Sequence, residues 1–248
     1  MPQPLFSIIT ITYNAATTLP PTLRSVESQT FTNYEYIVVD GASKDDTVAL
    51  VEASTLKARL VSEPDKGLYD AMNKGLKMAI GEYLIFLNAG DAFHAPDTLQ
   101  CIADIIGNNR PGVVYGETAI VDADRNFLMM RRLKAPEKLT WRSFAHGMLV
   151  CHQAFVARRD IAPLYDLQYR YSADVDWCIR CMKRTDELLN THLTLIDYLN
   201  EGETTRHHRA SLKERFAVMC HHYGTIPTVL RHIGFALRYA VARVRGRA

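Results

Sequence analysis

Residues 5–12 have the sequence LFSIITIT, a β-branched apolar stretch of the kind that forms a strand buried inside a parallel sheet. Three further segments predict strands, at Tyr36–Val39, Arg59–Ser62 and Tyr83–Leu87. Each predicted strand is separated from the next by a segment with helical signals. This alternation predicts an α/β fold in which helices cover both faces of a mostly parallel, Rossmann-like sheet.

The predicted helices begin at positions where helices commonly start. Thr17 and Thr18 precede Pro20 and Pro21, and proline is favoured in the first turn of a helix. The other predicted helices lie at about 47–53, 68–79, 96–106 and 174–183, and two short strands are expected at 113–115 and 119–121. The chain contains no internal repeat or clean linker, so one domain with a C-terminal appendage is the simplest organisation.

The charges divide the chain into two parts. The 248 residues include 29 Lys+Arg and 27 Asp+Glu, for a formal charge of only +2. Residues 205–248 hold nine basic residues and one acid, net +8, which leaves 20 basic and 26 acidic residues, net −6, in 1–204. A basic tail on an acidic body predicts that the tail meets an anionic partner.

Several classes of protein are excluded by composition. A hydrophobic content of 48% is ordinary for a globular protein. No apolar run reaches the roughly 20 residues of a membrane-spanning helix. The first residues, MPQPLFSIIT, lack the basic start of a signal peptide, and the five Cys are an odd number. A cytoplasmic protein with reduced thiols is therefore expected.

The loops that follow the predicted strands are polar or contain glycine. Their sequences are TYNA at 12–15, DGAS at 40–43, EPDKG at 63–67 and NAGD at 88–91. In an open α/β sheet, ligands bind beyond the carboxyl ends of the strands. Residues up to about 91 are therefore predicted to form a nucleotide-binding half.

Six blocks in this order resemble family 2 glycosyltransferases: FSIITITYNA, IVVDGASKDDT, EPDKGLYDAMNKG, GEYLIFLNAGD, CHQAFV and SADVDW. The nearest branch is the colanic-acid-type exopolysaccharide transferases. The resemblance implies a GT-A fold over 1–204, with a nucleotide-binding half at about 1–91 and an acceptor half at about 92–204. It also implies a nucleotide-diphosphate sugar donor, a Mg²⁺ or Mn²⁺ ion, and inversion at the anomeric carbon.

The resemblance implies that Asp91 binds the metal, which would neutralise the diphosphate as it leaves. The family usually has Asp-x-Asp-Asp here, whereas this chain has Asn88-Ala89-Gly90-Asp91. The alternative for this segment is a turn. The residues expected to line the nucleotide are Thr10, Thr12, Tyr13, Asn14, Asp40, Asp65, Lys66, Gly67 and Asn88, with Asp40 accepting a hydrogen bond from the base.

Asp174 matches the family's catalytic base, the carboxylate that removes the proton from the acceptor hydroxyl. Its alternative role is to cap the helix predicted to begin there. His152 and Gln153 resemble the acceptor-side block, although a buried, hydrogen-bonded His is almost as common. Arg206 and His207 are weak candidates for contact with the diphosphate.

Two other patterns have competing interpretations. Cys178 and Cys181 form a CxxC, but they fall within a predicted apolar helix, which favours a packed helical face over a zinc site. The segment 226–244 has apolar residues at helical spacing, flanked by Arg231, Arg238 and Arg245. This pattern predicts a helix lying on an anionic membrane surface or packed on the body, and no motif favours nucleic acid.

The sequence therefore predicts a transferase at the inner face of the cell membrane. Its donor is a nucleotide-diphosphate sugar, and its acceptor is a hydroxyl of a lipid-linked or surface-polysaccharide glycan. The alternative is a non-catalytic subunit that binds the same donor. A nucleotidyltransferase is less favoured, because TYNAATT follows the first strand where a Gly-rich, basic phosphate loop is expected.

Overall fold

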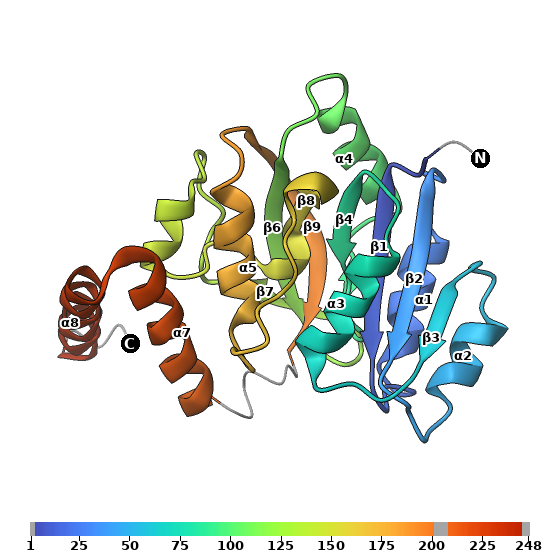
Figure 1. Ribbon diagram of the computed structural model, residues 1–248, viewed down its shortest axis with the longest axis horizontal. Helices are drawn as coiled ribbons and strands as arrows, with labels where there is room; N and C mark the ends of the chain where they lie inside the picture. Colours follow the sequence, from blue (N-terminus) through green and yellow to red (C-terminus); the bar gives the residue numbers. More distant parts are fainter. Residues whose placement is uncertain (1–2, 201–207, 245–248) are drawn as a thin grey trace.

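The computed structural model describes residues 3–200 and 208–244, with side-chain environments given for 3–200 and 210–234. The first half of the chain alternates strands and helices as the sequence predicts (Figure 1). Its elements are β1 (Phe6–Thr12), α1 (Leu19–Glu27), β2 (Tyr34–Asp40), α2 (Thr47–Ala53), β3 (Arg59–Ser62), α3 (Leu68–Met78) and β4 (Tyr83–Phe86).

The second half is more mixed, and one prediction for it is wrong. The two short strands expected at 113–115 and 119–121 form one continuous strand, β6 (Val113–Val121). The remaining elements are β5 (Ala92–Phe93), α4 (Thr98–Ile106), β7 (Phe127–Met130), η1 (Trp141–His146), η2 (His152–Ala154), β8 (Phe155–Arg158), η3 (Arg159–Ile161), α5 (Ala173–Met182), β9 (Leu188–Leu199), α7 (His208–Tyr223) and α8 (Thr225–Val244).

Within the described ranges, nine strands form one sheet with the order β3-β2-β1-β4-β8-β6-β9-β5, and β7 pairs with β6. The first four strands in this order are parallel, with Thr12 beside Asp40 and Asp40 beside Ser62. Strand β8 runs antiparallel to β4 and β6. The chain moves outward from β1 to β3 and returns to the other side of β1 at β4. The strand order therefore reverses between β1 and β4.

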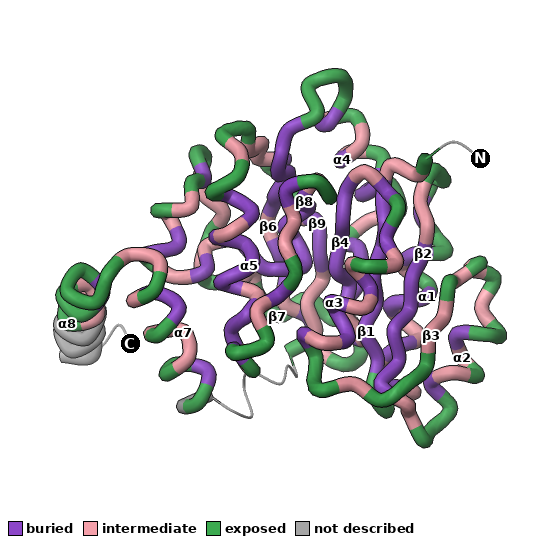
Figure 2. Tube along the Cα trace, in the orientation of Figure 1, coloured by how far each residue is buried: buried purple, intermediate pink, exposed green. Residues whose placement is uncertain are grey.

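This reversal also places the helices. Because crossovers between parallel strands are right-handed, the outward path puts α1 and α2 on one face and the return path puts α3 on the other (Figure 1). Strand β1 is buried along its whole length between the two layers (Figure 2). Two helix layers and a two-sided apolar sheet explain why the β1 sequence is a continuous apolar run rather than an alternating one.

The C-terminal segment consists of two different parts. Helix α7 packs on the body, where Ser211, Val218 and Met219 are buried and the Tyr223 ring stacks on Trp141 with centroids 5.5 Å apart. The described part of α8 instead carries exposed apolar side chains and extends from the body (Figures 1 and 2). The residues predicted as a single tail therefore include a helix that is part of the folded body.

Candidate functional site

The carboxyl ends of β1, β2, β3 and β4 meet at one edge of the sheet. The strand order reverses between β1 and β4, and ligands of open α/β sheets bind beyond the strands at such a reversal. The loops after these strands hold most of the residues that the sequence predicts to contact a nucleotide. Asp40, Asp91 and Asp174, which the sequence analysis assigned to one site, belong to three separate hydrogen-bond networks.

Asp40 at the end of β2 is fully buried, with 0% of its surface exposed. Its carboxylate accepts hydrogen bonds from Thr12 Oγ1 at 2.9 Å, Ser62 Oγ at 2.7 Å, and both the backbone N–H (2.9 Å) and the hydroxyl of Ser43. Burial alone would raise the pKa of Asp40, but these hydrogen bonds together hold it below its ordinary value. Asp40 is thus an ionised carboxylate that fastens the ends of three strands.

Thr10 and Asn14 likewise form hydrogen bonds within the protein. The buried Thr10 hydroxyl donates to Leu87 O at 2.7 Å and accepts from Tyr36 Oη–H at 3.0 Å. Asn14 adopts a left-handed backbone conformation with φ 47°, which Asn tolerates better than most residues. Its side-chain oxygen accepts from the Lys44 N–H at 2.9 Å. These two residues shape the loops around the predicted nucleotide site.

Tyr13 and the loop after β3 face solvent. Tyr13 is 66% exposed, whereas Tyr is on average intermediate in burial. In the loop, Asp65 Oδ1 accepts from the Gly67 N–H at 2.7 Å, and Asp70 Oδ2 accepts from the Lys66 N–H at 3.0 Å. Gly67 has φ +115°, a conformation that favours glycine, and α3 begins directly after it.

Asp174 lies in the first turn of α5 and is half-buried. Its Oδ1 accepts hydrogen bonds from the Tyr69 hydroxyl at 3.1 Å and from the Val175 N–H at 2.9 Å. Among the described residues, none donates to Oδ2. Tyr69 belongs to α3, so this contact joins the amino-terminal ends of α3 and α5.

His152 is part of an aromatic cluster beneath Asp174. It is 4% exposed, and its Nε2 lies 2.7 Å from the Tyr165 hydroxyl. Burial lowers the pKa of His152 to about 4, so the imidazole is neutral at pH 7. Asn73 forms two hydrogen bonds with the backbone of Tyr165, at 3.0 and 2.7 Å. This is the buried, hydrogen-bonded His that the sequence analysis gave as the alternative.

Asp91 is held by the protein on both oxygens. It is 4% exposed, its Oδ2 accepts from Gln153 Nε2 at 2.8 Å, and its Oδ1 accepts from the Leu199 N–H at 3.0 Å. Burial raises the pKa of Asp91 to about 7. Through Gln153 and Leu199, Asp91 connects the loop after β4 to η2 and to the end of β9.

The described residues do not form an all-protein cage for a metal ion. Over 3–200 and 208–244, no group of three or more His, Cys, Asp and Glu residues is arranged to hold a metal ion. In nucleotide sites Mg²⁺ is held by one or two carboxylates together with substrate phosphates, and each Asp91 oxygen accepts one hydrogen bond and keeps a further lone pair for such a bond. Among the described residues, Asn88 Oδ1 is buried without a hydrogen-bond partner, which leaves one amide oxygen unpaired in the loop after β4.

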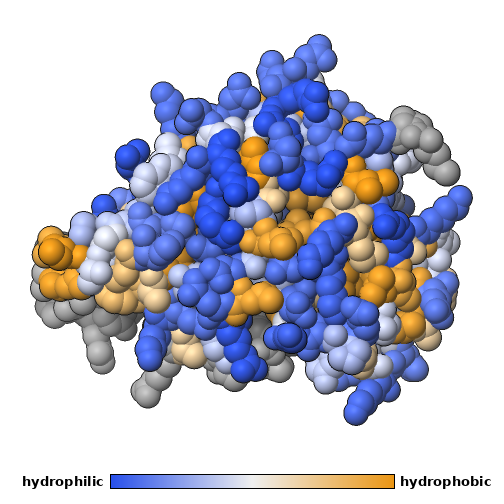
Figure 3. Space-filling view, in the orientation of Figure 1, coloured by the Kyte–Doolittle hydropathy of each residue, from blue (hydrophilic) through white to orange (hydrophobic). Residues whose placement is uncertain are grey.

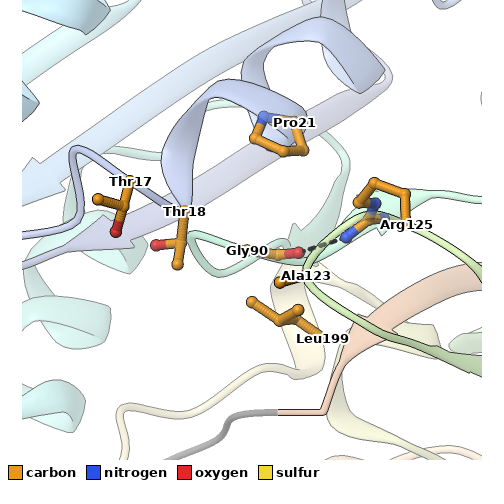
Figure 4. A pocket seen from close by; sticks show the side chains of 7 residues that line it. All are labelled: Thr17, Thr18, Pro21, Gly90, Ala123, Arg125 and Leu199. Carbon is orange, nitrogen blue, oxygen red and sulfur yellow. Dashed lines mark hydrogen bonds between the residues drawn. The ribbon is translucent and has the colours of Figure 1, made fainter.

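A cavity of about 210 Å³ lies between the β1–α1 loop and the loop after β4, at the strand reversal (Figure 4). Arg125, in the turn between β6 and β7, faces this cavity and donates from Nη1 to Gly90 O at 2.7 Å. Thr17 and Thr18 line the opposite side. Arg125 is not predicted from the sequence, because one Arg in a polar turn has no distinguishing pattern.

Glu214 of α7 is a second residue near the site that the sequence does not predict. Its carboxylate accepts hydrogen bonds from the backbone N–H groups of three successive residues: Arg170 (3.0 Å), Tyr171 (2.6 Å) and Ser172 (3.1 Å). These N–H groups lead directly into α5. Ser172 stands at the N-cap position but its side chain accepts no capping hydrogen bond, whereas Asp174 Oδ1 accepts from the Val175 N–H within the first turn.

The remaining candidates have simpler outcomes. Cys178 and Cys181 are buried in α5, where burial raises the pKa of both thiols, so they have the character of core residues. His222 Nε2 lies 2.8 Å from Asp176 Oδ1 and joins α7 to α5. Arg206 and His207 lie outside the described residues.

Comparison with known proteins identifies the family. A family model described as "Glycosyl transferase family 2" matches residues 7–163. The chain belongs to glycosyl transferase family 2. A "PGL/p-HBAD biosynthesis glycosyltransferase" of Mycobacterium bovis is 39% identical to this glycosyltransferase over 190 residues, which are 73% of this chain and 71% of the relative. The amylovoran biosynthesis glycosyltransferase AmsB of Erwinia amylovora is 30% identical over 194 residues, 72% of this chain and 64% of AmsB.

Solved structures confirm the predicted GT-A fold of this glycosyltransferase. Residues 1–349 of S. aureus TarS, in complex with UDP-GlcNAc, match with a TM-score of 0.69 at 20% identity, covering 86% of this chain and 64% of that chain. The mannosyltransferase PcManGT of Pyrobaculum calidifontis, in complex with GDP-Man and Mn²⁺, matches with a TM-score of 0.62 at 19% identity, covering 87% and 64%. A longer TarS chain is matched over 39% of its length.

Proposed function

We propose that this glycosyltransferase transfers a sugar from a nucleotide-diphosphate donor to an acceptor hydroxyl with inversion, and that Asp174 is the base. The observation that carries the proposal is the geometry of Asp174. One of its oxygens is fixed by Tyr69 and Val175, while no described residue donates to the other. A carboxylate held in this way can accept the proton of a hydroxyl that attacks the anomeric carbon.

The donor would lie along the edge where β1, β2, β3 and β4 end. Tyr13, Asp65 and Asn88 provide exposed or unpaired groups there. Arg125 supplies a cation at the cavity, where it could contact the diphosphate together with Arg206 and His207. Asp40 would support this site by holding the strand ends. Asp91 would hold a Mg²⁺ or Mn²⁺ ion, which would neutralise the charge of the departing diphosphate.

The proposal is tested with a panel of donors. Thermal melting of the protein with UDP-, GDP- and dTDP-sugars, each with and without Mn²⁺, should show stabilisation by one nucleotide class, because a ligand that binds the native state raises the melting temperature. Slow hydrolysis of that donor should follow in the absence of acceptor. Stabilisation without hydrolysis would instead favour the non-catalytic subunit.

The names of the relatives support a glycan acceptor. AmsB is named for amylovoran biosynthesis and the mycobacterial relatives for PGL/p-HBAD biosynthesis. We propose a lipid-linked or surface-polysaccharide acceptor at the inner face of the cell membrane. Membership of the colanic-acid-type branch is part of the same proposal.

Helix α8 supports a peripheral position on the membrane. Over the described residues, no helix is long and apolar enough to cross a bilayer. Ile226 (75% exposed), Leu230 and Ile233 project from the described half of α8, where hydrophobic residues gather at the left of Figure 3. Exposed apolar side chains on a basic helix are typical of helices that lie in an anionic membrane interface.

Replacing Ile226, Leu230 and Ile233 together by Asn should weaken binding to vesicles that contain anionic lipid by tenfold or more, since burying each apolar side chain contributes roughly 1.5–3 kcal/mol. Co-sedimentation with vesicles of 30% phosphatidylglycerol in phosphatidylcholine measures this binding. Removal of 225–248 should abolish it while α7 keeps the body folded. Equal sedimentation of the wild type and both variants would contradict a membrane role for α8.

A further inference from the structure

Gly41 lacks a side chain, and the side chains of two other residues fill the space beside it. It follows β2, and its N–H donates to Thr12 O at 2.9 Å, so it lies directly beside the end of β1. A Cβ at residue 41 would lie 2.6 Å from Asp65 Oδ2 and 3.2 Å from Tyr13 Cδ2. The space that a side chain of residue 41 would occupy is therefore filled by the Asp65 carboxylate and the edge of the Tyr13 ring.

The Asp65 carboxylate has one oxygen available for a ligand. Oδ1 accepts from the Gly67 N–H at 2.7 Å, which fixes the carboxylate relative to the start of α3. No residue in the described part of the chain donates to Oδ2. Asp65 thus differs from Asp40, which is buried and accepts four hydrogen bonds.

Tyr13 provides the second half of a binding site. Its ring is 66% exposed and lies beside Asp65 at the end of β1. An exposed aromatic ring is a surface on which a nucleobase can stack, and stacking is indifferent to the identity of the base. A carboxylate accepts hydrogen bonds but cannot donate them, so it favours a base that presents a ring N–H over cytosine and adenine, whose amino N–H groups lie beside a ring nitrogen acceptor that the carboxylate repels.

We propose that Asp65, with Tyr13 as the stacking surface, recognises the base of the donor nucleotide, and that this base is uracil or thymine. Either base presents one ring N–H, which matches the single available oxygen of Asp65. Guanine presents two neighbouring N–H donors, which a carboxylate with both oxygens open would accept better. This inference rests on the proposed function, and it assigns base recognition to Asp65 instead of Asp40.

The test compares UDP, CDP, GDP and ribose 5-phosphate as ligands of the full chain, with affinities measured by calorimetry. Cytosine has a ring acceptor where uracil has a ring N–H, so the wild type should bind UDP at least tenfold more tightly than CDP. D65N should lose most of this preference, because an amide can either donate or accept, and ribose 5-phosphate should bind both proteins equally. Y13A should weaken UDP and CDP by a similar factor of about tenfold.

Asp46 supplies the matched control, since it is exposed and its side chain does not cap α2. D46N should keep the wild-type preference for UDP, and circular dichroism of each variant checks that it folds. An unchanged UDP/CDP ratio in folded D65N would overturn the inference, and so would a wild-type preference for GDP over UDP. If the wild type binds no nucleoside diphosphate, the proposed function itself fails.

Discussion

Replacing Asp174 by Asn should reduce the rate of sugar transfer by about 10³-fold or more, because general bases contribute roughly 10²–10⁴-fold and an amide cannot take the proton. Asn is nearly isosteric with Asp, and its side-chain oxygen can still accept from the Tyr69 hydroxyl and the Val175 N–H. The fold and the affinity for the donor should therefore be unchanged. The measurement is kcat with saturating donor, together with the dissociation constant of the nucleotide.

Tyr69 provides the control for this result. Tyr69→Phe removes the hydroxyl that orients Asp174 Oδ1 but leaves the base in place, so a loss of about tenfold or less is expected, in keeping with the loss of one hydrogen bond. An Asp174→Asn enzyme that transfers sugar at the wild-type rate would remove Asp174 from the mechanism. A wild-type protein that binds the donor but neither transfers nor hydrolyses it would support the non-catalytic subunit.

The backbone of the nucleotide-binding half could be predicted from sequence because the patterns that indicate its strands and helices are local. Strand β3 begins and ends at the predicted residues, and α3 differs from its prediction by one residue. A buried parallel strand has a continuous apolar pattern, and the glycine before α3 marks a backbone conformation that other residues avoid. Strand β6 was predicted as two strands because Gly116 and Glu117 interrupt its apolar pattern, although pairing with β9 keeps the strand continuous.

The roles of individual carboxylates could not be predicted in the same way. Nothing in the sequence around Asp40 shows that Thr12 and Ser62, which are 28 and 22 residues away, donate to it. Asp91 depends on Leu199, 108 residues further along the chain. A motif places a carboxylate at the end of a strand, but only the packed structure shows how many of its oxygens are open to a ligand. Asp65 and Asp174 each keep one oxygen to which no described residue donates, whereas both oxygens of Asp40 and of Asp91 accept protein hydrogen bonds.

The role of the C-terminal segment likewise depends on contacts that the sequence does not show. Its charge separates it from the body, yet charge does not show that Glu214, the single acid among residues 205–248, accepts hydrogen bonds from residues 170–172. Those N–H groups lie just before the helix that carries Asp174. Glu214, which belongs to the segment expected to be a membrane tail, is therefore placed to fix the start of the helix that carries Asp174. The two parts of the segment differ in structure, since α7 contacts the start of α5 and the described part of α8 carries exposed apolar side chains.

Replacing Glu214 by Ala should lower the free energy of unfolding by about 2–4 kcal/mol, because three backbone N–H groups lose a charged acceptor and Ser172 is buried. The negative charge also stabilises the amino-terminal end of α5, where the helix dipole is positive. Without it the first turn of α5 should loosen and misplace Asp174. We expect kcat to fall by about one to two orders of magnitude, the scale on which small misplacements of catalytic groups act, while the affinity for the nucleotide stays unchanged.

The matched variants separate positioning from a general loss of stability. Glu214→Gln keeps one oxygen acceptor in the same place, so it should recover part of both the stability and kcat. Lys213→Ala alters the exposed neighbour on the same helix and should change neither. Urea unfolding gives the stability, and kcat measured well below the unfolding transition gives the catalytic effect.

A Glu214→Ala enzyme with wild-type kcat and wild-type stability would show that α7 does not hold Asp174. A loss of stability with unchanged kcat would restrict Glu214 to folding. If kcat falls in Glu214→Ala and is partly restored in Glu214→Gln, while the nucleotide affinity stays constant, Glu214 is the residue that positions Asp174.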